Sequence, residues 1–124
     1  MALNKQDILT VQDCKVVEVN VPEWGGSVFV KVMSGKQRDA WEEFVVAHKD
    51  KDGKINTAGL RSMLVATCVC DEFGNALFTD EDIPDIEKKN ASVLQRIFDE
   101  AAKLNGLTGE SAEAIKADFT KGQA

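Results

Sequence analysis

The most reactive side chain of this sequence is a lone histidine. His48 is the single histidine, and a histidine can act as a general base when a nucleophile accompanies it. The sequence contains no Gly-x-Ser-x-Gly elbow or comparable nucleophile motif. We therefore predict that His48 belongs to the apolar face of a helix, that the chain has no catalytic residues, and that the protein is not an enzyme.

Two further groups carry metal-ligand chemistry, and each lacks part of a site. Cys68 and Cys70 offer two thiolates without a nearby histidine, which is half of a structural zinc site. An acidic cluster lies at the predicted start of a helix, where the helix dipole favours negative charge. Capping therefore explains the cluster, and we predict no metal site and no cofactor. The cluster consists of Asp80, Glu81, Asp82 and Asp85.

The segment from Asp50 to Asn56 resembles half of a calcium-binding EF-hand loop. Its aspartates and its glycine fit loop positions three, five and six. His48 stands at the first ligand position and Gly59 at the twelfth, so the acidic first ligand and the bidentate glutamate are both missing. A polar turn is the favoured interpretation. The alternative function is a small calcium-responsive regulatory or interaction domain built on this loop.

Size and composition predict one cytosolic domain. The 124 residues suffice for one hydrophobic core, and 44% hydrophobic with 29% charged residues is typical of globular proteins. The net charge of -6 disfavours nucleic acid as a partner. No apolar run approaches the length of a membrane-spanning helix, and no secretory signal opens the sequence. The cysteines Cys14, Cys68 and Cys70 are predicted to be free thiols in the core.

Two valine-rich segments have the period of β-strands. Valines recur at alternate positions from Lys15 to Val21 and from Val28 to Val32, and side chains of a strand alternate between its faces. The segment between them has a proline that ends the first strand and paired glycines that tolerate positive φ. The sequence therefore predicts a β-hairpin.

Trp24 lies in the predicted turn of this hairpin. Two interpretations stay open for its side chain. It folds back onto the helices as part of the core, or it projects as an anchor for a partner protein, a role in which tryptophan is enriched. The core interpretation is favoured because a tryptophan at a hairpin tip can close a small sheet.

Helical patterns follow the hairpin. Ser34 with Gln37 forms a capping box, so a helix is predicted to begin near Gly35. Asn56 is predicted to cap the next helix. For Val65–Cys70 a strand competes with the helix because the segment is apolar and partly β-branched; helix is favoured by length.

The second half of the chain is also predicted to be helical. Thr79–Asp82 supplies caps for a helix with Pro84 in its first turn. Ser92–Leu104 carries the clearest amphipathic stripe, which is predicted to face the core and to stop at Gly106. A last short helix is predicted from Glu110 to Phe119.

These elements predict an α+β fold that is mostly α-helical with a small N-terminal β-hairpin. We expect a single domain over residues 1–124, with a flexible N-terminal end and a disordered C-terminal tail from about residue 120 to residue 124. Residues 3–13 are too short a sample to separate a helical turn from a strand.

Three short motifs occur in an order typical of one protein family. The first is Trp24-Gly25, and the third is Leu104-Asn105-Gly106 at the end of an amphipathic helix. The second follows an apolar helix and has the spacing Asp-x-x-Gly-x-x-Leu-Phe-x-x-x-Asp. Its residues are Asp71, Gly74, Leu77, Phe78 and Asp82. With these motifs the chain resembles the phage tail assembly chaperones over most of its length.

The resemblance implies a non-catalytic chaperone of a phage or prophage. Such a protein binds the tape measure protein, keeps it soluble and helps tail tube subunits assemble around it. The resemblance also implies self-association, contact with the tail tube protein mainly through a longer frameshifted form, and action in the host bacterial cytoplasm without a place in the mature virion. Neither nucleic acid nor membrane is an expected partner. The residues predicted to bind partners are Trp24, Phe29, Phe73 and Phe78.

Overall fold

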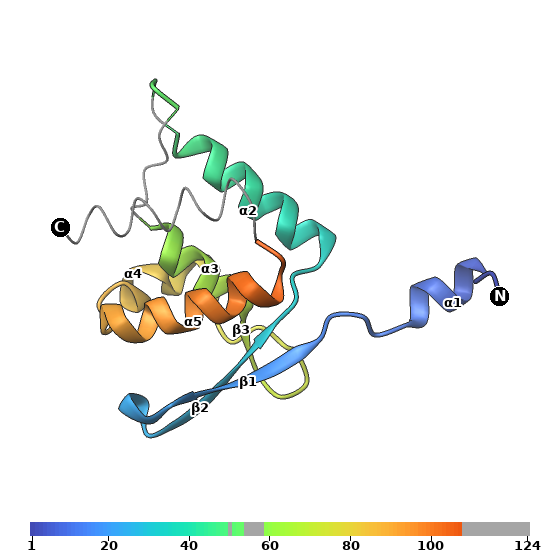
Figure 1. Ribbon diagram of the computed structural model, residues 1–124, viewed down its shortest axis with the longest axis horizontal. Helices are drawn as coiled ribbons and strands as arrows, with labels where there is room; N and C mark the ends of the chain where they lie inside the picture. Colours follow the sequence, from blue (N-terminus) through green and yellow to red (C-terminus); the bar gives the residue numbers. More distant parts are fainter. Residues whose placement is uncertain (50, 54–58, 108–124) are drawn as a thin grey trace.

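The computed structural model describes residues 1–49, 51–53 and 59–107 (Figure 1). It combines α-helices with a three-stranded antiparallel sheet, so the predicted α+β fold is confirmed. The elements in chain order are α1 (Lys5–Thr10), β1 (Val16–Val21), the 3-10 turn η1 (Pro22–Trp24), β2 (Gly26–Lys31), α2 (Gly35–Ala47), α3 (Leu60–Cys68), β3 (Val69–Cys70), the 3-10 turn η2 (Asp80–Asp82), α4 (Ile83–Ile86) and α5 (Ala91–Leu104).

The predicted hairpin is present and directs its valines to one face. β1 pairs with β2 in a register that sets Val17 opposite Val30 and Val19 opposite Val28. Because side chains alternate along a strand, these four valines share the face that packs on the helices. Val19 and Val30 are buried there.

The third strand lies in the segment for which a strand was the less favoured alternative to a helix. α3 ends at Cys68, and Val69 and Cys70 then pair with Val30 and Phe29 of β2. Both interpretations of Val65–Cys70 therefore hold in part, because the segment is helical up to Cys68 and forms a strand at Val69 and Cys70. Two residues are too few to show a period of two, so the sequence indicates this strand only through the apolar and β-branched character of the segment.

Two apolar clusters form the core, and α3 and α5 contribute to both. The stripe of α5 is buried as predicted. One cluster joins α2, α3 and α5, and the other joins the sheet to α3, α4 and α5. The first contains Met33, Trp41, Val45, Leu60, Leu64, Cys68, Phe98, Ala101 and Ala102. The second contains Val19, Val21, Val30, Val65, Ala66, Val69, Ile86, Val93, Leu94 and Ile97.

Several predicted helix ends are confirmed by their hydrogen bonds. Ser34 and Gln37 form the capping box of α2, with bonds of 3.0 and 3.2 Å. Pro84 lies in the first turn of α4, as predicted. The helix predicted after Asn56 begins at Leu60 with Gly59 as its N-cap. Asn56 itself, the helix predicted over 110–119 and the tail over 120–124 lie outside the described residues.

Residues 3–13 contain a helix. α1 begins with a capping box formed by Asn4 and Asp7, and none of its residues is buried. It stands away from the remaining elements at one end of the long axis of the molecule (Figure 1). The question that the sequence left open is thus decided in favour of a helical segment.

Among the described residues, no helix is both long enough and apolar enough to cross a lipid bilayer.

Candidate functional site

His48 takes part in the end of α2. It is the C-cap of that helix, and its Nδ1–H donates to the carbonyl oxygen of Phe44 at 2.8 Å. Its ring stacks on the Phe44 ring, with the centroids 4.1 Å apart. The imidazole is half-buried in these contacts, which account for its place on the apolar side of the helix.

Two of the three cysteines lie in the core. Cys68 and Cys70 are buried, and burial raises the pKa of Cys68 to about 12 and also raises the pKa of Cys70. Both thiols therefore stay protonated at neutral pH, whereas a metal ligand must be a thiolate. Cys14 is exposed, so the prediction that it belongs to the core is wrong.

The acidic cluster caps the turn before α4. The Thr79 N–H donates to the Asp82 carboxylate at 2.9 Å, which is the predicted capping interaction. Asp85 lies 3.7 Å from the Lys88 ammonium on the surface. In the part of the chain that the structure describes, no three His, Cys, Asp or Glu side chains gather as a metal site would require. Most of the segment from Asp50 to Asn56 lies outside that part.

A rigid loop after β3 presents apolar side chains to solvent. The Asp71 carboxylate accepts the backbone N–H groups of Phe73 at 2.8 Å and Asn75 at 2.9 Å, and the Asn75 side-chain amide at 3.0 Å. The bonds from Asn75 make the largest contribution to lowering the pKa of Asp71. The loop is thereby fixed at its start as a turn around one carboxylate.

The same loop is attached to the sheet. The Lys31 ammonium donates to the Gly74 carbonyl oxygen at 3.1 Å. Gly74 has φ of 88°, a left-handed backbone conformation that glycine adopts without the steric cost of a Cβ. These contacts explain why the second motif requires its aspartate and its glycine.

We call Phe73 and Leu77 the loop surface. Phe73 is 80% exposed and Leu77 is 55% exposed. Side chains so exposed contribute little buried apolar area to the fold, and aromatic residues are enriched among the anchors of protein interfaces. The loop surface is therefore the first candidate partner-binding site.

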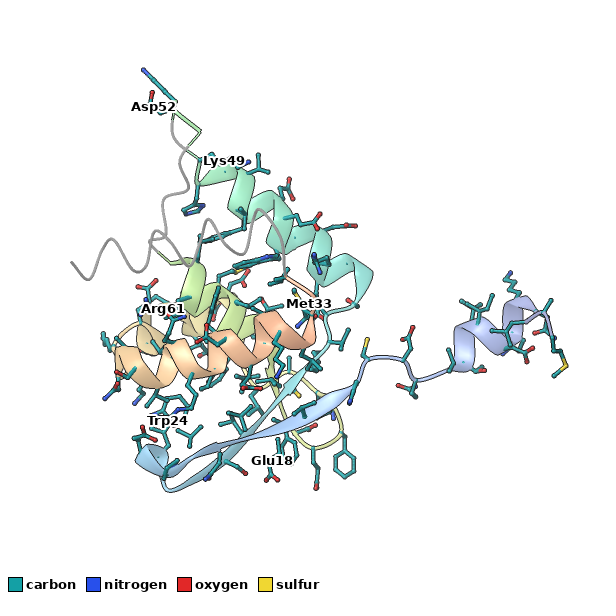
Figure 2. The ribbon with its side chains drawn as sticks, viewed as in Figure 1. Glu18, Trp24, Met33, Lys49, Asp52 and Arg61 are labelled. Atoms are coloured by element: carbon teal, nitrogen blue, oxygen red, sulfur yellow. The ribbon has the colours of Figure 1, made fainter. Side chains whose placement is uncertain are left out.

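A second apolar surface is a groove of about 430 Å³, which we call the Trp24 groove. It lies between the hairpin turn, α3, β3 and α4. Trp24 is 42% exposed at the turn end of the hairpin (Figure 2), so the interpretation that placed it in the core is wrong. The groove is lined by Trp24, Val65, Val69, Phe78, Asp82, Asp85, Ile86 and Lys89.

An ion pair holds the turn that carries Trp24. The Arg96 guanidinium of α5 donates to both carboxylate oxygens of Glu23, at 2.8 and 2.5 Å. The hydrogen bond from Arg96 is the main reason why the pKa of Glu23 is lowered to about 2. Gly25 follows with φ of 79° and closes the 3-10 turn. The edge of the groove is thus fixed relative to α5.

The four predicted partner-binding residues fall on different parts of the molecule. Trp24 and Phe78 line the same groove. Phe73 belongs to the loop surface, and Phe29 is half-buried in β2 opposite Cys70. Sequence reasoning did not select Leu77 for binding, although it belongs to the second motif. It also had no signal for Ile86 and Lys89, because only the packing of α4 brings them to the groove.

Comparisons with known proteins agree with this architecture. The family model described as phage tail assembly chaperone matches residues 8–117. The solved structure of the bacteriophage HK97 tail assembly chaperone is similar, with a TM-score of 0.56 and 23% sequence identity, over 73% of this chain and 85% of that chain. At this identity the likeness concerns the fold. A comparison with curated proteins gives no match.

Proposed function

This chain belongs to the phage tail assembly chaperone family, and from that premise we propose that it binds the tape measure protein without catalysing a reaction. The bound chaperone keeps this client soluble and helps tail tube subunits assemble around it. Residues 1–124 act as one unit in the host bacterial cytoplasm and do not remain in the mature virion. Contact with the tail tube protein occurs mainly through a longer, frameshifted form.

The loop surface is the observation that carries this proposal. Phe73 is the most exposed of the aromatic side chains named above, and the bonds around Asp71 order its backbone before any partner arrives. A side chain presented in this way loses little conformational freedom when it binds, and pre-ordering of this kind favours affinity. We propose that Phe73 and Leu77 contact apolar segments of the tape measure protein.

The charge of the chain fits a chaperone that works in many copies. Each copy carries a net charge of -6, so copies that coat one client repel other such assemblies and remain dispersed. We propose that several copies line one tape measure protein. These copies cover the apolar side chains of the tape measure protein, which would otherwise contact other tape measure proteins and aggregate.

Co-expression tests the proposal. The tape measure protein from the same genome is produced with and without this chain, and the soluble fraction and the co-purified amount are measured. We expect the tape measure protein to be soluble only together with this chain and to co-purify with it. A tape measure protein that stays insoluble, or one that is soluble but unbound, would overturn client binding.

A further inference from the structure

The segment before β1 carries apolar side chains that no described residue of its own chain covers. We call residues 3–15 the arm. Leu3, Ile8, Leu9 and Val11 are all exposed, and α1 buries no residue. A helix of six residues is too short to be stable without contacts of its own, because isolated helices below about 12–15 residues are marginal in water. The arm therefore has the properties of a segment that docks on another surface.

The face of α1 that holds these side chains also holds a positive charge. Ile8 and Leu9 follow Lys5 by three and four residues, and residues at these spacings lie side by side on a helix. The arm thus presents two aliphatic side chains with one ammonium group beside them.

The Trp24 groove has the complementary composition. Its apolar lining comes from the indole, Phe78, Ile86 and two valines, and its charged residues are Asp82, Asp85 and Lys89, two carboxylates against one ammonium group. Asp85 is exposed, with Lys88 at 3.7 Å as a surface partner. Aliphatic side chains of the arm match the lining, and Lys5 matches the two carboxylates.

The arm and the groove of one chain lie far apart. α1 stands at one end of the long axis, and Trp24 lies at the other end of the molecule (Figures 1 and 2). The five residues between α1 and β1 reach at most about 17 Å when fully extended, and they leave β1 in the direction away from the groove. The groove that an arm meets therefore belongs to a second copy.

We propose that the arm of one copy docks its Ile8 and Leu9 face in the Trp24 groove of the next copy. Because the two surfaces differ and lie at opposite ends, the contact is head-to-tail and lets one copy join two neighbours. This inference rests on the proposed function, in which several copies cover one elongated client, and it names the surfaces that join them.

Disulfide trapping between two chains that each carry a single exposed cysteine tests the proposal. Cys14→Ser removes the exposed thiol, and Cys68 and Cys70 are buried. In that background one full-length variant carries Leu9→Cys and the other carries Lys89→Cys at the groove. The two are mixed without client and mildly oxidised. We expect the mixed disulfide dimer at least about tenfold above a control pair, since docking raises the effective thiol concentration.

The control pair combines Leu9→Cys with Lys49→Cys, an exposed position at the end of α2. Equal yields from the two pairs would overturn the proposal. A chain that carries both Leu9→Cys and Lys89→Cys and closes its disulfide within one molecule at high dilution would also overturn it, because the arm would then fill its own groove.

Charge reversal provides a second measurement in solution. Sedimentation of the wild-type chain is expected to show a mass that rises with concentration beyond a dimer. Lys5→Glu should weaken association by about two- to fivefold, the effect of one surface ion pair, and Asp85→Lys in the same chain should restore it. Ile8→Asp with Leu9→Asp should weaken it by about 100-fold or more.

A wild-type chain that stays monomeric at all concentrations would contradict the proposal. Since no client is present, these outcomes are independent of client binding.

Discussion

Asn105, a residue of the third motif, joins three elements through one side chain. Its Oδ1 accepts the Met33 N–H at 2.6 Å, and its Nδ2 donates to the carbonyl oxygens of Lys31 at 3.3 Å and Ala101 at 2.8 Å. Its own carbonyl accepts from Arg38 at 2.9 Å. The end of β2, the start of α2 and the end of α5 are thus fixed together by this residue.

Asn105→Ala is expected to destabilise the fold. The substitution leaves the partly buried Met33 N–H without its acceptor, which costs about 1–3 kcal/mol of unfolding free energy. Urea denaturation measures this change. Asn20→Ala on the exposed side of β1 is the control and should change the stability by less than about 0.5 kcal/mol. Equal effects of the two substitutions would refute the role of Asn105.

The cysteines give a second prediction for single residues. Cys14 is exposed, while Cys68 and Cys70 are buried and burial raises the pKa of each of these two thiols. A thiol-specific reagent at neutral pH should therefore modify Cys14 quickly and the other two only after unfolding. Mass spectrometry of the native and the denatured protein counts the modified thiols. Rapid native modification of Cys68 would contradict the packing of α3.

Residue types alone did not decide which side chains are exposed. Cysteine is a residue type that is usually buried, but Cys14 is exposed in the arm. Trp24 lines a groove instead of lying in the core. The pattern around Trp24 revealed a turn, while the contact of Glu23 with α5 that sets the direction of this turn joins residues far apart in sequence. Local patterns carry no information on such contacts.

At the scale of elements, the hairpin turn and α5 are joined by the pair of Glu23 and Arg96. Both side chains are 39% exposed, so solvent screens the pair and its contribution is small. The direction of its pH dependence is nevertheless defined, because the pKa of Glu23 is lowered from 4.5 to about 2 in the folded chain. The contribution is complete above pH 4.5 and is lost as the pH falls toward 2.

The lowered pKa of Glu23 predicts a pH dependence of the stability. The stability difference between the wild-type chain and Glu23→Gln should be largest above pH 4.5 and should shrink as the pH approaches 2. Arg96→Gln should behave in the same way, and the double variant should add nothing further. Urea denaturation at several pH values measures the difference. A difference that does not depend on pH would mean that the two side chains do not pair in solution.

Elements with many periodic residues or with a local capping or proline signal could be predicted, whereas β3 and α1 could not. α5 and the hairpin repeat their pattern several times, and the capping box of α2 is a local signal. β3 has two residues and depends on β2 for its hydrogen bonds, so it exists only in the folded chain. α1 is short and buries nothing, so its sequence shows no face turned toward a core.

At the scale of the whole molecule, the fold class could be predicted but the partner-binding surfaces could not. Trp24 and Phe78 are distant in sequence, and the packing of α4 on the core brings them to one groove. Phe73 was selected as an aromatic residue, whereas the proposal that it anchors a client rests on the hydrogen-bonded turn around Asp71. We propose separate regions of one chain for its two partners, with the loop surface for a client and the Trp24 groove for a second copy.

The most direct measurement is the amount of tape measure protein that co-purifies with three full-length variants. We expect the wild-type chain and Val46→Asp to retain it equally, since Val46 is an exposed apolar residue of α2 away from the loop surface. Phe73→Asp should retain at least about tenfold less, as for loss of a central anchor, with an unchanged circular dichroism spectrum. Equal retention by Phe73→Asp, or an equal loss with Val46→Asp, would contradict client binding through the loop surface.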